Sequence, residues 1–198
     1  MAMPVKKFQE VVWGYYRRHR RDFPWRLTKD PYRILVTEIM LQQTQAERVV
    51  PYFNNWVGRF PNFKKLAVAP VADILRAWQG LGYNRRALAL KRAAEQVMRE
   101  HRGVLPNDRD ALRKLPGVGA YTAGAVQAFA FDLPVPFIET NIRRVFIHHF
   151  FPRRRKVADA EIVPLVEQTM DMRRPREWFS ALMDYGAMLA LHLPKGAN

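Results

Sequence analysis

The chain has 198 residues and no cysteine, and its 33 Lys and Arg outnumber its 18 Asp and Glu to give a formal net charge of +15. Its 12% aromatic content requires an interior, which excludes a disordered basic tail. The lack of Cys excludes disulfides, thiolate metal sites, a cysteine nucleophile and cysteine-ligated iron–sulfur clusters. We expect no metal and no cofactor. No apolar run approaches the roughly 18 residues of a membrane span, and the N-terminal residues lack a signal-peptide core. We therefore expect a cytoplasmic, nucleoid-associated protein without membrane contact.

The excess of positive charge indicates an anionic partner, and nucleic acid is the first candidate. Arg predominates in most of the basic clusters, and its planar guanidinium pairs better with phosphate oxygens than a point charge does. The clusters lie at 17–21, 85–86, 143–144, 153–156 and 173–174. The alternative is that each cluster is only a solvated helix face. A membrane surface is disfavoured, because no segment combines a long basic face with an uninterrupted apolar one.

Helical periodicity dominates the chain, and Pro and Gly punctuate it at short intervals, which predicts an all-α protein. The pattern predicts helices over 5–20, 31–45, 47–59, 71–78, 84–102, 108–114, 119–130, 140–150, 158–171 and 175–190. Asp30 is a good N-cap for the second helix, and Gly103 suits a C-terminal stop. The basic run at 151–160 is the segment most expected to form a long exposed loop.

The most specific local pattern is LRKLPGVGAYTAG at 112–124. One helix is expected to end at Leu115, two glycines to form a tight turn, and a new helix to start at once. Gly117 and Gly119 would permit left-handed backbone and close approach, leaving backbone N–H groups free to hold a phosphate. The alternative is an ordinary corner between two helices.

This stretch resembles the helix-hairpin-helix of the DNA base-excision glycosylase superfamily, which contains endonuclease III and the MutY-type adenine glycosylases. Four further segments are similar to the adenine glycosylase pattern in its usual order: FPWR at 23–26, TEIMLQQTQ at 37–45, GLGYNRRA at 80–87 and LMDYGAM at 182–188. The resemblance implies two helical lobes around a DNA-binding cleft. Residues 22–134 would form a six-helix lobe with the hairpin at 112–126, and 1–21 plus 135–198 a second lobe. Ala190 stands where the family's first cluster cysteine is expected, so packing by Trp178, Phe179, Leu182, Met183 and Leu189 would replace the iron–sulfur loop.

Cleavage of a purine N-glycosidic bond needs an acid for the leaving base and negative charge near the sugar, so two carboxylates are expected. Glu38 lies in an uncharged segment and matches the family's adenine-protonating glutamate; alternatively it is only a helix acid. Glu139 stands where the family has an aspartate, and a misplacement of about 1 Å can cost on the order of a hundredfold in rate. Three outcomes stay open for Glu139, namely the same role, retuning for another base, or weak catalysis, beside a purely helix-capping one. Asn141 would orient Glu139 or hold a phosphate.

Tyr121 occupies the position where bifunctional members carry a Schiff-base lysine, so lyase activity is not expected. Gln42 and Tyr83 match the positions that fill the gap left by a flipped base, although both could be structural. The resemblance implies DNA contacts by Gln42, Gln43, Tyr83, Leu115, Gly117, Val118, Gly119 and Arg143. It places Trp25, Arg26 and Asp184 at the base pocket, although a Trp between Pro and Arg could equally belong to the core.

These features predict a monomeric, monofunctional DNA glycosylase of base excision repair that removes a mispaired adenine opposite 8-oxoguanine or guanine. Its partner would be double-stranded DNA containing a mismatch or damaged base. The alternatives are the same fold acting on another mismatched, deaminated or alkylated base, a non-catalytic binder of damaged DNA, and, more weakly, an endonuclease III-like lyase.

Overall fold

The computed structural model describes residues 3–154 and 156–192, and it divides into two compact units. We call Phe23–Phe131 the inner unit, because it lies between the two segments of the other unit in the sequence. Those flanking segments, up to Asp22 and from Asp132 onward, form the outer unit. Helices dominate both, so the all-α prediction is confirmed for the described residues. In this part of the chain, no helix is both long and apolar enough to cross a bilayer.

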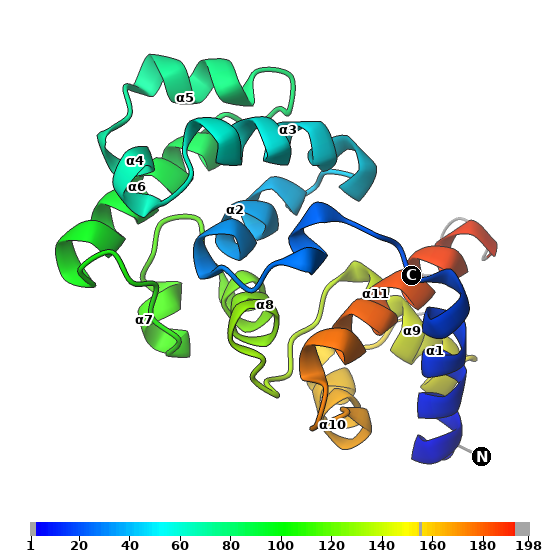
Figure 1. The fold of residues 1–198 in the computed structure, drawn as a ribbon. Coiled ribbons are helices and arrows are strands. Elements are labelled where there is room, and N and C mark those ends of the chain that lie inside the picture. Colours follow the sequence, from blue (N-terminus) through cyan, green and yellow to red (C-terminus); the bar gives the residue numbers. More distant parts are fainter. Residues whose placement is uncertain (1–2, 155, 193–198) are drawn as a thin grey trace. The chain divides into compact units, whose positions relative to one another are not determined.

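The inner unit is built around α2, which packs against α3, α6, α8 and the short 3-10 helix η1 (Figure 1). Its elements are η1 (Pro24–Leu27), α2 (Pro31–Leu41), α3 (Ala46–Arg59), α4 (Phe63–Val68), α5 (Val71–Trp78), α6 (Arg85–Glu100), α7 (Arg109–Arg113) and α8 (Ala120–Phe131). The stretch 122–130 of α8 is buried on every side, as expected for a helix without a polar face. Most residues of α2 and α8 are therefore buried where the two helices pack against each other.

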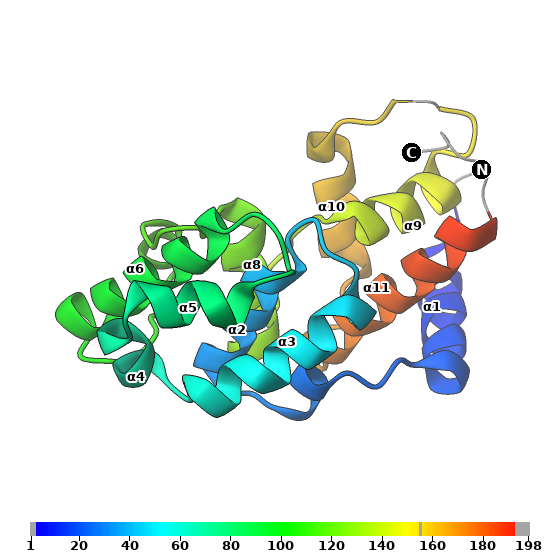
Figure 2. The ribbon, with the colours of Figure 1, turned by 90° about the horizontal axis from the view of Figure 1, so that it is seen from above.

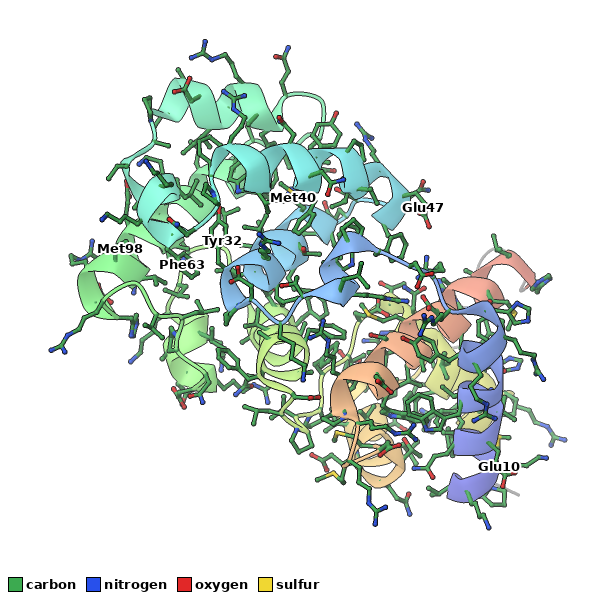
Figure 3. All side chains as sticks on the ribbon, viewed as in Figure 1. Glu10, Tyr32, Met40, Glu47, Phe63 and Met98 are labelled. Atoms are coloured by element: carbon green, nitrogen blue, oxygen red, sulfur yellow. The ribbon has the colours of Figure 1, made fainter. Side chains whose placement is uncertain are left out.

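Aromatic side chains fix the helices around α2. The Tyr32 ring lies edge-on to Phe63, with ring centroids 4.9 Å apart (Figure 3). The Tyr32 hydroxyl donates to the Phe60 carbonyl and accepts from Trp56 Nε1 at 3.2 Å, so its polar atom is satisfied inside the core. These contacts join the start of α2 to the end of α3 and to α4.

The outer unit contains α1 (Val5–His19), α9 (Thr140–Phe150), α10 (Asp159–Thr169) and α11 (Pro175–His192). In it α11 packs against α9 and α1, and α10 packs against α9 and α1 (Figure 2). Phe8 anchors the centre, with ring centroids 5.2 Å from Phe146 and 6.0 Å from Trp178. Of the five α11 residues predicted to hold this region together, four are buried and Met183 is half-buried.

Most predicted helix boundaries agree with the structure within two residues, but two elements and one boundary differ. The predicted 31–45 helix ends at Leu41, because the chain leaves helical geometry at Gln42 and Gln43 has a φ of 55°. The helix α4 and the 3-10 helix η1 were not predicted. Part of the expected loop at 151–160 is the first turn of α10, and residue 155 of that loop lies outside the described residues.

Candidate active site

The predicted hairpin is present between α7 and α8. Gly117 has a φ of 82°, and a Cβ there would lie 3.0 Å from Ala89 Cβ and 3.5 Å from Ile39 Cδ1. A side chain would thus be both strained and crowded against α6 and α2. Gly119 differs from the prediction, because its φ is not left-handed and a Cβ there would meet nothing within 4 Å.

The hairpin exposes backbone rather than apolar side chains. Leu115 and Val118 are buried, and the Val118 N–H donates to the Leu115 carbonyl at 3.1 Å to close the turn. Gly117 and Gly119 are exposed. The first N–H groups of α8 have no acceptor within the helix. Gly117 and Gly119 have only backbone to offer to a ligand, and the DNA contacts predicted for Leu115, Gly117, Val118 and Gly119 stay predictions.

Glu38 lies in the last turns of α2 and is buried, with a relative exposure of 3%. The Tyr121 hydroxyl, from the first turn of α8, donates to Glu38 Oε2 at 2.9 Å. The two residues are 83 positions apart in the chain, and only the packing of α2 against α8 brings them together. The structure thus places a buried carboxylate and a phenol next to the exposed hairpin.

Gln42 connects the end of α2 to the hairpin. Its side-chain Nε2 donates to the Gly117 carbonyl at 3.1 Å and to Thr122 Oγ1 at 3.3 Å. The neighbouring Gln43 is exposed and has left-handed backbone. Gln42 and the hairpin therefore form one connected surface element.

Tyr83 ends the short turn that precedes α6. Its φ is 51°, uncommon for a bulky residue, and its side chain is 55% exposed. The guanidinium carbons of Arg85 and Arg86 lie 5.7 and 5.4 Å from its ring centroid. Tyr83 is thus an exposed aromatic ring beside two cations.

Glu139 and Asn141 lie together in the outer unit, at the start of α9. Glu139 caps this helix: its Oε1 accepts from the Ile142 N–H at 2.9 Å, and its Oε2 accepts from Asn141 Nδ2 at 3.2 Å. Burial raises the pKa of the Glu139 carboxyl, although these two donors and the Arg144 charge oppose the shift. Glu139 therefore caps α9, and its predicted catalytic role stays a prediction.

Arg144 and Gly186 hold the Asn141 amide in place. Arg144 Nη1 donates to Asn141 Oδ1 at 2.8 Å and to the Gly186 carbonyl at 3.0 Å. Because Asn141 Oδ1 is occupied by a donor, its Nδ2 is oriented toward Glu139. The sequence analysis treated Arg144 only as part of a basic cluster.

The remaining predicted site residues have structural partners of their own. Asp184 is buried, and its carboxylate accepts from the Arg21 backbone N–H at 3.0 Å and from Arg21 Nε at 2.7 Å. Trp25 stacks on Phe23 with centroids 4.9 Å apart, and the Arg26 guanidinium lies 5.4 Å from the same ring. Roles in a base pocket stay predictions for these residues.

Arg143, predicted to contact DNA, donates to the Val157 carbonyl at 3.1 Å and pairs with Asp159. These contacts fix its side chain along the segment that leads into α10. The predicted DNA contact stays a prediction.

A helical unit with a glycine hairpin beside a buried glutamate is typical of the helix-hairpin-helix class of DNA-repair proteins. A family model described as "HhH-GPD superfamily base excision DNA repair protein" matches residues 36–165, and the chain belongs to this family. It is 49% identical over 133 residues to the adenine DNA glycosylase of Mycobacterium tuberculosis (strain ATCC 25618 / H37Rv), which covers 67% of this chain and 44% of that protein. The chain spans about half the length of the curated relatives it matches.

The fold also occurs in solved structures, among them the following two. A thermostable thymine-DNA glycosylase superposes with a TM-score of 0.84 at 30% identity, covering 96% of this chain and 88% of that one. Endonuclease III in a non-covalent complex with DNA gives a TM-score of 0.74 at 17% identity, covering 98% and 97%. The second likeness supports the fold alone.

Proposed function

We propose that the chain is a monofunctional DNA glycosylase that hydrolyses the N-glycosidic bond of a mispaired adenine opposite 8-oxoguanine or guanine. The observation that carries this proposal is the buried Glu38 carboxylate, held by the Tyr121 hydroxyl beside an exposed helix-hairpin-helix turn. The relative named adenine DNA glycosylase supports the choice of base.

In the proposed reaction, protonated Glu38 donates to a ring nitrogen of adenine as the bond between the sugar C1′ and the base N9 breaks. The bonding electrons leave with the base, and an oxocarbenium-like sugar remains. The Glu139 carboxylate stabilises this cation, and Asn141 keeps that carboxylate oriented. Water then adds to C1′ to give the abasic sugar and releases a proton to solvent, from which Glu38 is reprotonated. Tyr121 has no amine, so no Schiff base forms with the sugar and no strand nick follows.

The proposed partner is double-stranded DNA with a mismatch or damaged base, bound by a monomer in the nucleoid. The hairpin backbone would hold a phosphate, while Gln42 and Tyr83 fill the space left when the target base is flipped out. The exposed ring of Tyr83 supports this role, because aromatic rings stack on bases. The base pocket would be lined by Trp25, Arg26 and Asp184. The DNA backbone would be contacted by Gln43 and Arg143.

Single-turnover assays on labelled duplexes with adenine opposite 8-oxoguanine or guanine test the proposal, with alkali to reveal abasic sites. Glu38→Gln should slow adenine release by at least about a hundredfold, because a general acid typically contributes 10²- to 10⁴-fold. Its affinity for an undamaged duplex should stay within about threefold, since the variant keeps the shape of the side chain. Glu10→Gln, on the exposed part of α1, is the matched control (Figure 3). Unchanged release by Glu38→Gln, or none by the native chain, would overturn the proposal.

A second candidate is removal of a mismatched thymine, favoured by the TM-score of 0.84 to the thymine-DNA glycosylase. The same assay on duplexes with thymine opposite guanine separates the two. Faster release of thymine than of adenine would replace the first candidate.

A further inference from the structure

Arg86 is a buried arginine that binds the carbonyls of two separate turns. One follows α2 at 42–44, and the other, the Tyr83 turn, precedes α6 at 80–83. Its side chain belongs to the first turn of α6, and the residue is only 6% exposed. Nη1 donates to the carbonyls of Ile39 at 3.2 Å and Met40 at 2.9 Å, to the Gln42 carbonyl, and to Thr44 Oγ1 at 3.1 Å. Nη2 donates to the carbonyls of Leu81 at 3.3 Å and Gly82 at 3.1 Å.

These acceptors explain why the charge can be buried. Arg86 forms no ion pair among the described residues, and its hydrogen-bond acceptors are backbone carbonyls and one hydroxyl. Its guanidinium carbon also lies 5.4 Å from the ring centroids of Trp78 and Tyr83. The carbonyls of Ile39 and Met40 belong to the C-terminal end of α2, where carbonyls without a partner in the helix carry partial negative charge. The guanidinium therefore caps α2 at the point where the chain turns into Gln42 and Gln43.

Each of the two turns contains a non-glycine residue with left-handed backbone. These are Gln43, with a φ of 55°, and Tyr83, with a φ of 51°. Such a conformation persists only when the surrounding structure holds it, and it concentrates at functional sites. The Tyr83 turn is held further by Trp78 Nε1, which donates to the Gly82 carbonyl at 2.9 Å, and by Arg48, which donates to the Gly80 carbonyl.

Gln42 extends the same network to the hairpin. Its carbonyl is bound by Arg86, while its side-chain amide is bound to Gly117 and Thr122. One guanidinium thus lies at the junction of three segments: the end of α2, the Tyr83 turn and, through Gln42, the helix-hairpin-helix.

We infer that Arg86 is a positioning residue that fixes the positions of Gln42 and Tyr83 relative to each other. Both side chains can then enter the DNA duplex together when the target base is unstacked. This inference rests on the proposed function. Arg86 does not touch DNA itself, since it is buried, and it acts through the two turns. A guanidinium is required because its two terminal nitrogens point to different turns, whereas a lysine has one nitrogen.

The test is Arg86→Lys, measured with a duplex that carries fluorescent 2-aminopurine opposite guanine at the target position. At saturating protein, the native chain should raise 2-aminopurine fluorescence as the base unstacks. Arg86→Lys should reduce that rise at least about fivefold, while its affinity for an undamaged duplex stays within about threefold. Val97→Ala is the control, because Val97 is buried on the same helix and takes no part in the network.

Amide hydrogen exchange of the free protein gives a readout that needs neither DNA nor chemistry. Arg86→Lys should accelerate exchange at least about tenfold at 42–44 and 80–83, and Val97→Ala should not. If Arg86→Lys does not fold, Thr44→Val removes a single acceptor of Arg86. It should accelerate exchange at the same residues and reduce the fluorescence rise, both by smaller factors. Native unstacking by Arg86→Lys, or equal losses in Val97→Ala, would overturn the inference. Normal unstacking by the native chain without adenine release would instead overturn the proposed function alone.

Discussion

His149 on α9 illustrates how burial sets the chemistry of a single side chain. Its Nε2 lies 3.0 Å from the Tyr185 hydroxyl, and its ring packs edge-on against Phe8. Burial, with the neighbouring His148, lowers the pKa of His149 to about 4. A group with a lowered folded-state pKa stabilises the fold above its unfolded pKa of about 6.5, and this stabilisation is lost as pH falls toward 4.

Replacing His149 with Gln should therefore weaken the acid sensitivity of folding. Between pH 7.5 and 5, the free energy of unfolding of the native chain should fall by about 1 kcal/mol more than that of His149→Gln, which is below the full linkage value because the His149 ring is only partly buried. Urea unfolding at the two pH values measures this difference. The exposed His192→Gln is the matched control and should behave like the native chain. Equal pH dependence in all three proteins would show that folding does not lower the pKa of His149.

Glu139 should change the stability in the opposite direction with pH, because burial raises the pKa of this carboxyl. An acid with a raised folded-state pKa favours the fold below its unfolded pKa, and this contribution is lost as pH rises through the folded value. Ionised Glu139 therefore reduces stability at neutral pH. The unfolding free energy of Glu139→Gln, relative to the native chain, should increase between pH 4 and pH 7.5, even though adenine release is lost. A difference that is constant with pH, measured by urea unfolding, would show that folding does not raise the pKa of the Glu139 carboxyl.

At the scale of elements, α9 and α11 approach so closely at Gly186 that no side chain fits. A Cβ at Gly186 would lie 2.4 Å from the Asn141 carbonyl oxygen and 2.7 Å from Asn141 Cβ. Gly186→Ala must push α9 away from α11 and displace Asn141 and Glu139. We expect a loss of about 1–3 kcal/mol in unfolding free energy and a fall in adenine release of more than about tenfold. Urea unfolding and single-turnover assays measure the two effects.

Gly58→Ala is the control for that substitution. Gly58 also lies within a helix, α3, but a Cβ there would meet nothing within 4 Å. Removing a helical glycine without a clash should stabilise the protein by about 0.5–1 kcal/mol and leave the rate unchanged. If both variants lose the same stability, the close approach of α9 and α11 is not the cause.

Helix starts were predictable where the signal is local, and one such signal was missed. Asp30 caps α2 as predicted, because its side chain accepts from the Tyr32 N–H at 2.9 Å. Asn62 caps α4 in the same way through the Lys65 N–H, and this N-cap could have revealed α4. The resemblance supplied Glu38 and Tyr121 separately, but only tertiary packing joins them. The end of α2 was mispredicted because Arg86, more than 40 residues later, caps it.

At the scale of the whole chain, the net charge of +15 is the dominant feature, and basic clusters occur in both units. Several cations are already paired, such as Arg154 with Glu161, whereas Arg153 and Lys156 are exposed. Exposed cations bind phosphates by releasing counterions, so affinity for duplex DNA must depend steeply on salt.

The salt dependence of binding can be measured without cleavage by using Glu38→Gln and an adenine-mismatch duplex, which this variant should not cleave. Its association constant should fall by about 10²–10³ between 50 and 200 mM salt, because each phosphate contact adds about −0.9 to the slope of log K against log salt. Replacing Arg153 and Lys156 with Gln should make the slope shallower by about 1–2. The single-turnover rate of the native chain at saturating protein should change less than about twofold over the same range, because Glu38 is buried and screening by salt is weak there. A salt-independent association constant would mean that the charge serves some purpose other than phosphate contact.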